Sequence, residues 1–158
     1  MKKTALALAS ALFLLAACDS LGLDDGAAGG AGGAGGVATP GTQGDLSTNI
    51  GDRVFYETDS SVLSNEAQAT LARQAEWLKQ YSNVNVVIEG HCDERGTREY
   101  NIALGERRAA AAKNYLVSLG VDAGRLSTIS YGKERPAVVG HDESSWSQNR
   151  RAVTVIAN

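Results

Sequence analysis

The sequence predicts an α/β fold, an α/β sandwich in which helices pack on one mixed four-stranded sheet. Two long segments repeat apolar residues with the period of a helix, and segments rich in β-branched residues separate and follow them. In chain order these give β-α-β-α-β-(short α)-β, the pattern of helices layered on a sheet with crossover connections. Hydrophobic residues make up 43% of the 158 residues, which is enough for a core.

The first strand and helix are expected between residues 50 and 81. The segment DRVFYET (52–58) has the β-branched and aromatic character of a strand, and we expect the folded part to begin near Ile50. Ser64 is a helix cap, with Glu66 in the first turn. The helix should end near Tyr81, and its apolar face recurs at steps of four, four and three residues: Ala67, Leu71, Ala75 and Leu78.

Three strands and two helices are expected in the second half. The segment VNVVIEG (84–90) alternates as a strand, and the second long helix should run from near Glu99 to the C′ residue Gly120. The segments LSTISYG (126–132) and RRAVTVIA (150–157) are the remaining strands, and DESSWSQN (142–149) is a short helix between them. The long helix should bury one stripe of residues: Ile102, Gly105, Ala109, Ala112, Leu116 and Leu119. The last strand should place Val153 and Val155 on one face.

The N-terminus is typical of a targeting segment. A basic MKK precedes ALALASALFLLAA (5–17), which has the length of a signal h-region and is too short to span a bilayer alone. It ends in LAAC, which resembles the bacterial lipobox, whose cysteine is lipidated and becomes the first mature residue. We therefore expect residues 1–17 to be a lipoprotein signal peptide and Cys18 to be the lipidation site.

A glycine-rich segment follows. Residues 26–36 read GAAGGAGGAGG, without apolar periodicity, and such a chain cannot offset its ordering entropy. We expect residues 18–45 to be the lipidated N-terminus and a flexible linker, and residues 46–158 to be the folded domain. About 27 residues of such chain span roughly 30 Å on average and at most about 90 Å.

Charge and cysteine content exclude some classes of function. Removal of Lys2 and Lys3 with the signal peptide leaves 13 basic and 18 acidic residues, a net charge of −5, so nucleic-acid binding is not indicated. With Cys18 lipidated, Cys92 has no partner for a disulfide within the chain.

The segment GHCDERGTREYNIALGERRA (90–109) carries the candidate site. Neighbours in a strand point to opposite faces, so His91 and Cys92 should not form a catalytic pair, and His141 is in a separate loop. A metal site would need three or four convergent ligands, and the sequence fixes no such geometry for His91, Asp93, His141 and Asp142. We expect neither catalysis, nor a metal, nor a cofactor.

A third interpretation is a binding site for a zwitterion. Leu104 and Arg108 lie four residues apart on one helix face, and Asp93 is in the loop that leads into this helix. Arg108 is expected on the stripe that flanks the apolar one, where it can lean over the edge of the sheet. An aspartate can accept hydrogen bonds from an ammonium while an arginine holds a carboxylate with two. By spacing alone, a structural ion pair between Asp93 and Arg108 is an equal alternative.

The motif resembles the peptidoglycan-binding signature of the OmpA-like C-terminal domain family, with Asn101, Leu104, Gly105, Arg108 and Ala109 as the helix half. The segments SYGKERPAVVGHDE and SQNRRAV (130–143 and 147–153) narrow the match to a lipoprotein branch of that family, and the resemblance covers residues 54–158.

The resemblance implies non-covalent binding of the diaminopimelate in the peptidoglycan stem peptide. The family's aspartate falls on Asp93, its arginine on Arg108 and its pocket leucine on Leu104. A segment that ends the first strand also touches the ligand in the family, and it matches Thr58 and Asp59 here, although Glu57 and Thr58 depart from the pattern. Cys92 is expected to be a small buried residue.

The resemblance also implies a cellular role. The chain would be anchored in the outer membrane by lipid and hold the cell wall as part of the Tol system, in envelope integrity and cell division, with the periplasmic propeller protein TolB as a competing partner. Asp19 directly after the lipidated cysteine retains lipoproteins at the inner membrane in some bacteria, but the outer membrane is the expected location. The alternatives are a peptidoglycan hydrolase and an OmpA-like wall anchor outside the Tol system.

Overall fold

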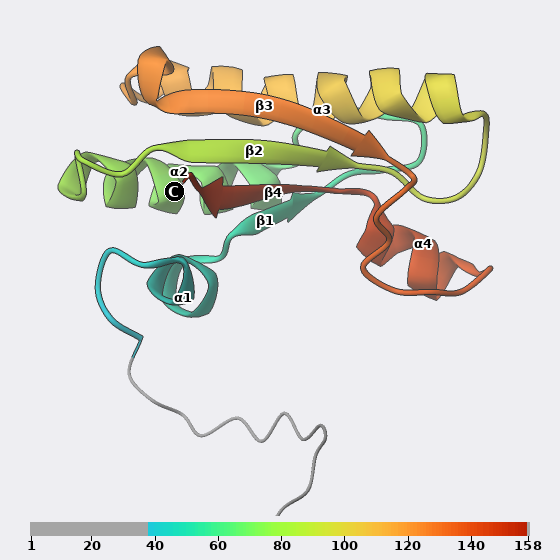
Figure 1. Ribbon diagram of the computed structural model, residues 1–158, viewed down its shortest axis with the longest axis horizontal. Coiled ribbons are helices and arrows are strands. Elements are labelled where there is room, and N and C mark those ends of the chain that lie inside the picture. The colour runs from blue at the N-terminus through green and yellow to red at the C-terminus, as the bar shows by residue number, and fades with distance from the viewer. Residues whose placement is uncertain (1–37, 158) are drawn as a thin grey trace, which may run out of the picture. The chain divides into compact units, whose positions relative to one another are not determined.

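The computed structural model describes residues 38–157, which contain one mixed sheet of four strands (Figure 1). The strand order is β1-β4-β2-β3, with β2 parallel to β3 and β4 antiparallel to both β1 and β2. The strands are β1 (Arg53–Phe55), β2 (Val86–His91), β3 (Leu126–Gly132) and β4 (Arg151–Ile156). The last strand therefore inserts between the first two.

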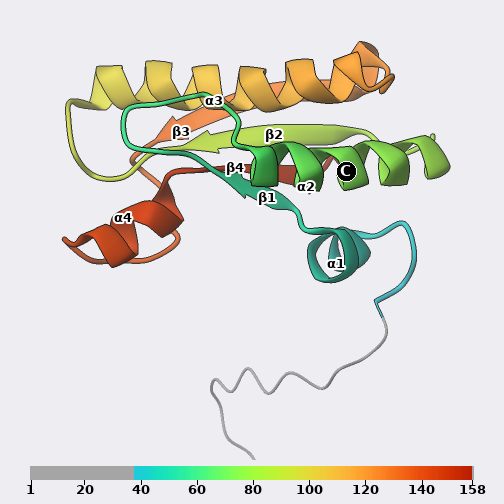
Figure 2. The same cartoon turned by 180° about the vertical axis from the view of Figure 1, so that it is seen from behind.

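Two long helices, α2 (Asn65–Gln80) and α3 (Arg98–Ser118), pack on the same face of the sheet (Figures 1 and 2). The short elements are α1 (Gln43–Asp45), a π-helical turn at Leu46–Ile50, a 3-10 turn at Ala123–Arg125 and α4 (Glu143–Asn149). The predicted α/β sandwich of helices on a mixed four-stranded sheet is confirmed.

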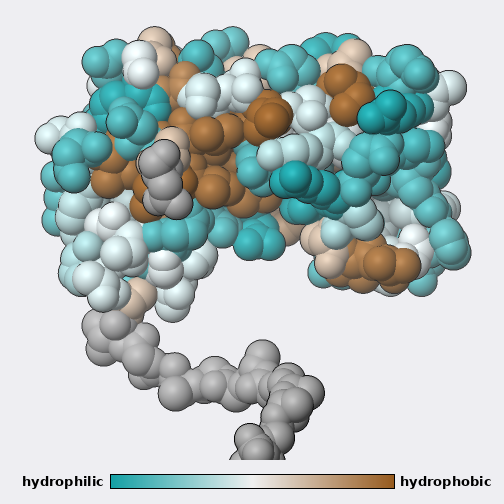
Figure 3. Space-filling view, in the orientation of Figure 1, coloured by the Kyte–Doolittle hydropathy of each residue, from teal (hydrophilic) through white to brown (hydrophobic). Residues whose placement is uncertain are grey.

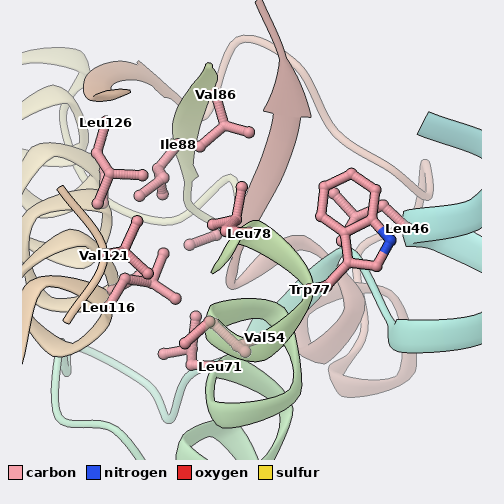
Figure 4. Packing of buried hydrophobic residues seen from close by; sticks show 14 of the residues in the cluster. Leu46, Val54, Leu71, Trp77, Leu78, Val86, Ile88, Leu116, Val121 and Leu126 are labelled. Carbon is pink, nitrogen blue, oxygen red and sulfur yellow. The ribbon is translucent and has the colours of Figure 1, made fainter. Parts of the chain in front are cut away.

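The core lies between the sheet and these helices (Figure 4). Val86 and Ile88 of β2 are at most 1% exposed, as the strand alternation predicted. Burial of an aliphatic side chain of this kind contributes about 1.5–3 kcal/mol. The helices add their apolar faces to the same cluster: Leu71, Ala75, Leu78, Ala109, Ala112 and Leu116.

Capping residues fix where the helices begin and end. The Ser64 hydroxyl accepts a hydrogen bond from the Ala67 N–H at 3.1 Å, as predicted. Thr97 caps α3 in the same way, through the Tyr100 N–H at 3.2 Å, so α3 begins one residue before Glu99. The helix ends at Ser118, and Gly120 follows its C-cap Leu119 with a φ of 94°, a conformation that favours glycine.

A pair of glycines brings α3 close to the sheet. A Cβ atom on Gly90 of β2 would lie 1.8 Å from the Gly105 carbonyl oxygen of α3, and one on Gly105 would lie 2.2 Å from the Ser130 hydroxyl oxygen. Only glycine permits this approach. Because the contact lies one turn before Arg108, it also sets how deeply that arginine is inserted.

Several predicted details differ from the structure. The first strand ends at Phe55, because the chain turns at Thr58 and Asp59. Val153 and Val155 do share a face, but it is the face opposite the helices and they are only partly buried; Figure 3 shows hydrophobic residues over the strands on that side. The core side of β4 is formed by Ala152 and by Thr154, whose hydroxyl donates to the Gln74 side chain at 2.8 Å.

The folded part begins earlier than the expected boundary at residue 46. Asp45 is 7% exposed and accepts a hydrogen bond from the Trp77 indole N–H at 2.8 Å. The Gln43 side chain binds the backbone at the end of β4. Its amide oxygen accepts from the Ile156 N–H at 2.8 Å, and its amide nitrogen donates to the Thr154 carbonyl at 3.2 Å. Leu46 is fully buried. We therefore place the domain boundary before residue 43.

One residue of α3 also differs from its expected position. Ile102 was expected on the buried stripe of that helix, but its side chain is 37% exposed.

Within residues 38–157, no helix is long and apolar enough to cross a membrane. The expected signal peptide, the lipidation site Cys18, Asp19 and most of the linker lie outside the described residues.

Candidate ligand-binding site

A pocket of about 260 Å³ opens where β2 ends and α3 begins, at the right-hand end of the sheet in Figure 1. It brings together residues from the β1–α2 loop, the β2–α3 loop and the first three turns of α3. All five residues predicted to bind a ligand line it, together with five others: Thr58, Asp59, Asp93, Leu104 and Arg108; Cys92, Arg95, Gly96, Tyr100 and Asn101.

Asp93 is buried and bound by two arginines. Its Oδ1 accepts from the Arg95 backbone N–H at 3.1 Å and from Arg95 Nε at 3.2 Å. Its Oδ2 accepts from Arg95 Nη2 at 2.7 Å and from Arg150 Nη1 at 3.4 Å. Burial alone would raise the pKa of Asp93, but these hydrogen bonds outweigh it and lower the pKa, so the residue is an anion at neutral pH.

Arg108 is fully buried and does not pair with Asp93. Its guanidinium donates to three backbone carbonyls, those of Ser60 at 2.8 Å, His91 at 2.9 Å and Glu57 at 3.1 Å. It also lies 5.3 Å from the ring of Tyr56. An arginine has five N–H donors, so two remain for a ligand. The alternative of a direct ion pair between Asp93 and Arg108 is wrong.

The position of Arg108 also differs from the expected one. The helical pattern placed it on the stripe that flanks the apolar one, leaning over the edge of the sheet, whereas it lies beneath the β1–α2 loop. The three carbonyls explain the difference, because a buried guanidinium is tolerated when its donors are satisfied. Arg108 therefore fixes that loop against β2 in addition to lining the pocket.

The inner end of the pocket is apolar, and hydrogen bonds to Asn101 of α3 hold it in place. Leu104 is 4% exposed and Cys92 is 3% exposed, which confirms Cys92 as a small buried residue. The Cys92 thiol donates to the Asn101 carbonyl at 3.3 Å, and burial raises its pKa. The Asn101 amide in turn donates to the Arg95 carbonyl at 2.7 Å and holds the β2–α3 loop closed.

Thr58 and Asp59 form the opposite wall. The Thr58 hydroxyl accepts from Arg95 Nη2 at 3.3 Å, and the Tyr100 hydroxyl donates to the Asp59 carboxylate. Asp59 has a φ of 58°, a left-handed conformation that aspartate tolerates better than most residues. The turn predicted to contact the ligand is therefore joined to both the β2–α3 loop and α3.

His91 takes no part in this pocket. Its ring lies 5.5 Å from the ring of Tyr131; neither ring nitrogen makes a hydrogen bond among the described residues, and the nearest carboxylate, that of Glu89, lies 3.5 Å from Nε2. Burial, together with the charges of Arg151, Arg135 and Arg53, lowers its pKa to about 4. Within residues 38–157 no group of three or more His, Cys, Asp or Glu side chains could hold a metal ion.

Two important arginines were missed by the sequence analysis. Arg95 lies two residues after Asp93 and was visible as part of the DER triplet, but spacing alone did not indicate its bidentate contact. Arg150 lies 57 residues from Asp93 and reaches it because β4 inserts next to β2. The segment SQNRRAV carries Arg150, so the resemblance already contained that signal.

Known proteins share the sequence and the fold of this domain. Residues 55–150 match the model of the OmpA family. A peptidoglycan-associated lipoprotein of Mesorhizobium japonicum is 57% identical over 147 residues, which are 93% of this chain and 88% of that protein. The crystal structure of the peptidoglycan-associated lipoprotein from Burkholderia pseudomallei superposes with a TM-score of 0.67 at 40% identity, over 72% of this chain and all of that one.

A more distant structure shares the fold alone. The C-terminal domain of Helicobacter pylori MotB has a TM-score of 0.63 at 20% identity, over 68% of this chain and 84% of that one. The family match covers more than half of the chain, and the similarity to the lipoproteins extends over almost its full length. The chain therefore belongs to the OmpA family, within which it groups with the peptidoglycan-associated lipoproteins.

Proposed function

We propose that this chain is a lipid-anchored protein of the outer membrane that binds peptidoglycan without changing it. The observation that carries the proposal is the pocket in which a buried carboxylate, Asp93, and a buried guanidinium, Arg108, lie without pairing to each other. The names of the relatives support the same ligand. The ligand group would be the diaminopimelate of the stem peptide, which presents an ammonium beside a carboxylate.

The chemistry of the pocket suits both ends of this zwitterion. Asp93 is held as an anion and can accept hydrogen bonds from the ammonium. Arg108 keeps two N–H donors after its three carbonyl contacts, and these can bind the carboxylate. Leu104 offers an apolar surface for the methylene chain that leads to this charged group. Thr58 and Asp59 supply polar groups at the rim.

The same geometry argues for binding over catalysis. A nucleophilic cysteine needs thiolate character, whereas burial raises the pKa of Cys92. The neighbouring imidazole cannot act as its base, because His91 packs against Tyr131. The residues of the pocket can therefore hold a ligand in place.

The cellular role extends this proposal beyond the pocket. Lipid on Cys18 would hold one end of the chain in the outer membrane while the domain holds the wall, and the glycine-rich segment would provide the reach between them. We further propose that the chain acts in the Tol system, in envelope integrity and cell division, with TolB competing for the pocket side of the domain. A wall anchor that works outside the Tol system is the alternative, and a pull-down with TolB distinguishes the two.

A sedimentation assay on purified peptidoglycan tests the ligand. Free diaminopimelate should displace the wild-type protein, and Asp93→Asn should lose about 2–5 kcal/mol of binding, because the ligand ammonium is left desolvated without a counter-charge. Glu99→Gln is the matched control, since Glu99 is exposed in the first turn of α3. Circular dichroism confirms that each variant is folded. Full wall binding by a folded Asp93→Asn protein would exclude the assignment.

A second measurement tests the hydrolase alternative. The protein is incubated with muropeptides, and the products are separated by chromatography. The proposal expects an unchanged profile, whereas new fragments would show that the chain is an enzyme.

A further inference from the structure

The Asp93 carboxylate has no free acceptor site in the ligand-free pocket. A carboxylate offers about four lone-pair positions. Here four N–H groups point at them: the Arg95 backbone N–H and Nε on Oδ1, and Arg95 Nη2 and Arg150 Nη1 on Oδ2. A ligand ammonium can therefore reach Asp93 only if one of these donors leaves.

The Arg150 guanidinium is fixed. Its side chain is 5% exposed, its Nε donates to the Tyr56 carbonyl at 3.0 Å, and its Nη2 bonds the Glu143 carboxylate at 2.5 Å. The Arg95 backbone N–H is fixed as well, because the Asn101 amide holds the carbonyl of the same residue. Neither donor can leave without disrupting the loop or α4.

The Arg95 guanidinium, in contrast, is the exposed donor of the set, and apart from Asp93 it donates only to the Thr58 hydroxyl, at 3.3 Å. Its side chain is 39% exposed and lies over the ring of Trp146 at 4.1 Å. Trp146 stays in place without Arg95, because its indole N–H donates to Glu94 at 3.0 Å and Glu94 also bonds His141 at 2.8 Å. An arginine that slides along an aromatic face keeps much of its cation–π attraction.

We propose that Arg95 is a displaceable counter-ion that closes the pocket, and that the ligand ammonium binds Asp93 by taking its place. This inference rests on the proposed function. Binding is then an exchange of one cation for another on Asp93, with Arg150 as the permanent partner. The exchange also selects the ligand, because a molecule without an ammonium cannot compensate Asp93 for the lost guanidinium.

The consequence is that Arg95 weakens binding. If Arg95 leaves Asp93 in about a tenth to a third of the molecules, as expected for a partly exposed ion pair, the measured affinity falls to about that fraction of the intrinsic affinity. Arg95→Met removes the competing charge and keeps an aliphatic chain to cover Trp146. The variant should bind diaminopimelate about three- to tenfold more tightly than the wild type.

Calorimetry on the full-length chain in detergent, with free diaminopimelate as the probe, tests this. Arg98→Met is the control, because it removes an exposed arginine three residues away that pairs with Glu134 at 3.2 Å, and its affinity should not change. Pimelate, which has the carboxylates without the ammonium groups, should not bind Arg95→Met more tightly. Arg95→Gln repeats the test with a second side chain.

Nuclear magnetic resonance on the wild type provides a readout that needs no variant. On adding diaminopimelate, the Nε–H signal of Arg95 should shift and that of Arg150 should stay. Equal or weaker binding by Arg95→Met, or a shift confined to Arg150, overturns the inference and leaves the proposed function intact. No binding of diaminopimelate by the wild type or any variant overturns the proposed function, and the exchange with it.

Discussion

Replacement of Arg108 by methionine should destabilise the domain severely. The variant keeps most of the aliphatic volume but has no donor for the carbonyls of Glu57, Ser60 and His91. Each buried acceptor left without a partner costs about 1–3 kcal/mol. The hydrogen bond to His91 is buried, whereas those to Glu57 and Ser60 are only partly buried, so water entering from the pocket can satisfy part of them.

The expected total is therefore about 3–5 kcal/mol, below the simple sum for three acceptors and in the range measured when a buried polar network is broken. Urea unfolding at pH 7, followed by circular dichroism, measures it. Arg107→Met is the control, because Arg107 is exposed at the preceding position of α3 and its loss should change the unfolding free energy by less than about 0.5 kcal/mol. A loss below about 1 kcal/mol for Arg108→Met would refute the structural role. Because a wall-binding defect of this variant mixes folding with binding, Asp93→Asn is the cleaner test of the site.

Three further outcomes are expected. His91 has a pKa of about 4 in the folded protein, below its value in the unfolded chain, so on acidification the unfolded chain binds the proton first. The free energy of unfolding should therefore fall by up to about 3 kcal/mol from pH 6.5 to pH 4. Urea titrations at several pH values should show a flatter profile for His91→Phe than for the wild type. Gly90→Ala should lower the unfolding free energy by at least about 2 kcal/mol, because its Cβ would overlap the Gly105 carbonyl and force α3 outward, and thermal unfolding would show no change if α3 can shift freely. Cys18→Ser should release the protein from membrane fractions, since the acyl chains supply the attachment, and mature-size variant protein in the outer membrane would contradict the lipoprotein assignment.

The sequence predicted those elements whose burial follows a simple period. The four-residue steps of α2 lie on its buried face, and the alternation of Val84, Val86 and Ile88 follows the core side of β2. The caps Ser64 and Gly120 were equally clear, because each has a local physical cause. Periodicity says nothing of strand order, however, so the insertion of β4 between β1 and β2 could not be deduced, and with it the contact of Arg150 with Asp93.

Two other errors have the same origin in local reasoning. The segment 43–46 lies next to a glycine-rich stretch and is too short to show a pattern, and it is ordered by contacts with Trp77 and β4 that are distant in sequence. Arg108 was expected on the stripe that flanks the apolar one, and charged residues in general are rarely buried. Three backbone carbonyls reverse that rule here, and backbone carbonyls leave no trace in the side-chain pattern.

Two arginines of the domain both donate to backbone carbonyls but differ in their surroundings, and this difference is why the charges of the pocket point to a ligand. Arg125 donates from Nε and Nη2 to the carbonyls of Leu78, Tyr81 and Val84, so it joins the end of α2 to the start of β2 as a structural residue. Arg108 does similar work but also lines a pocket that contains Asp93. A buried charge is weak evidence of a role in stability, because apolar residues in its place often give an equally stable protein. Ionisable groups with perturbed pKa values, in contrast, cluster at functional sites. Four N–H groups occupy the acceptor positions of Asp93, and the proposed displaceable donor, Arg95, is the one that a ligand cation would replace.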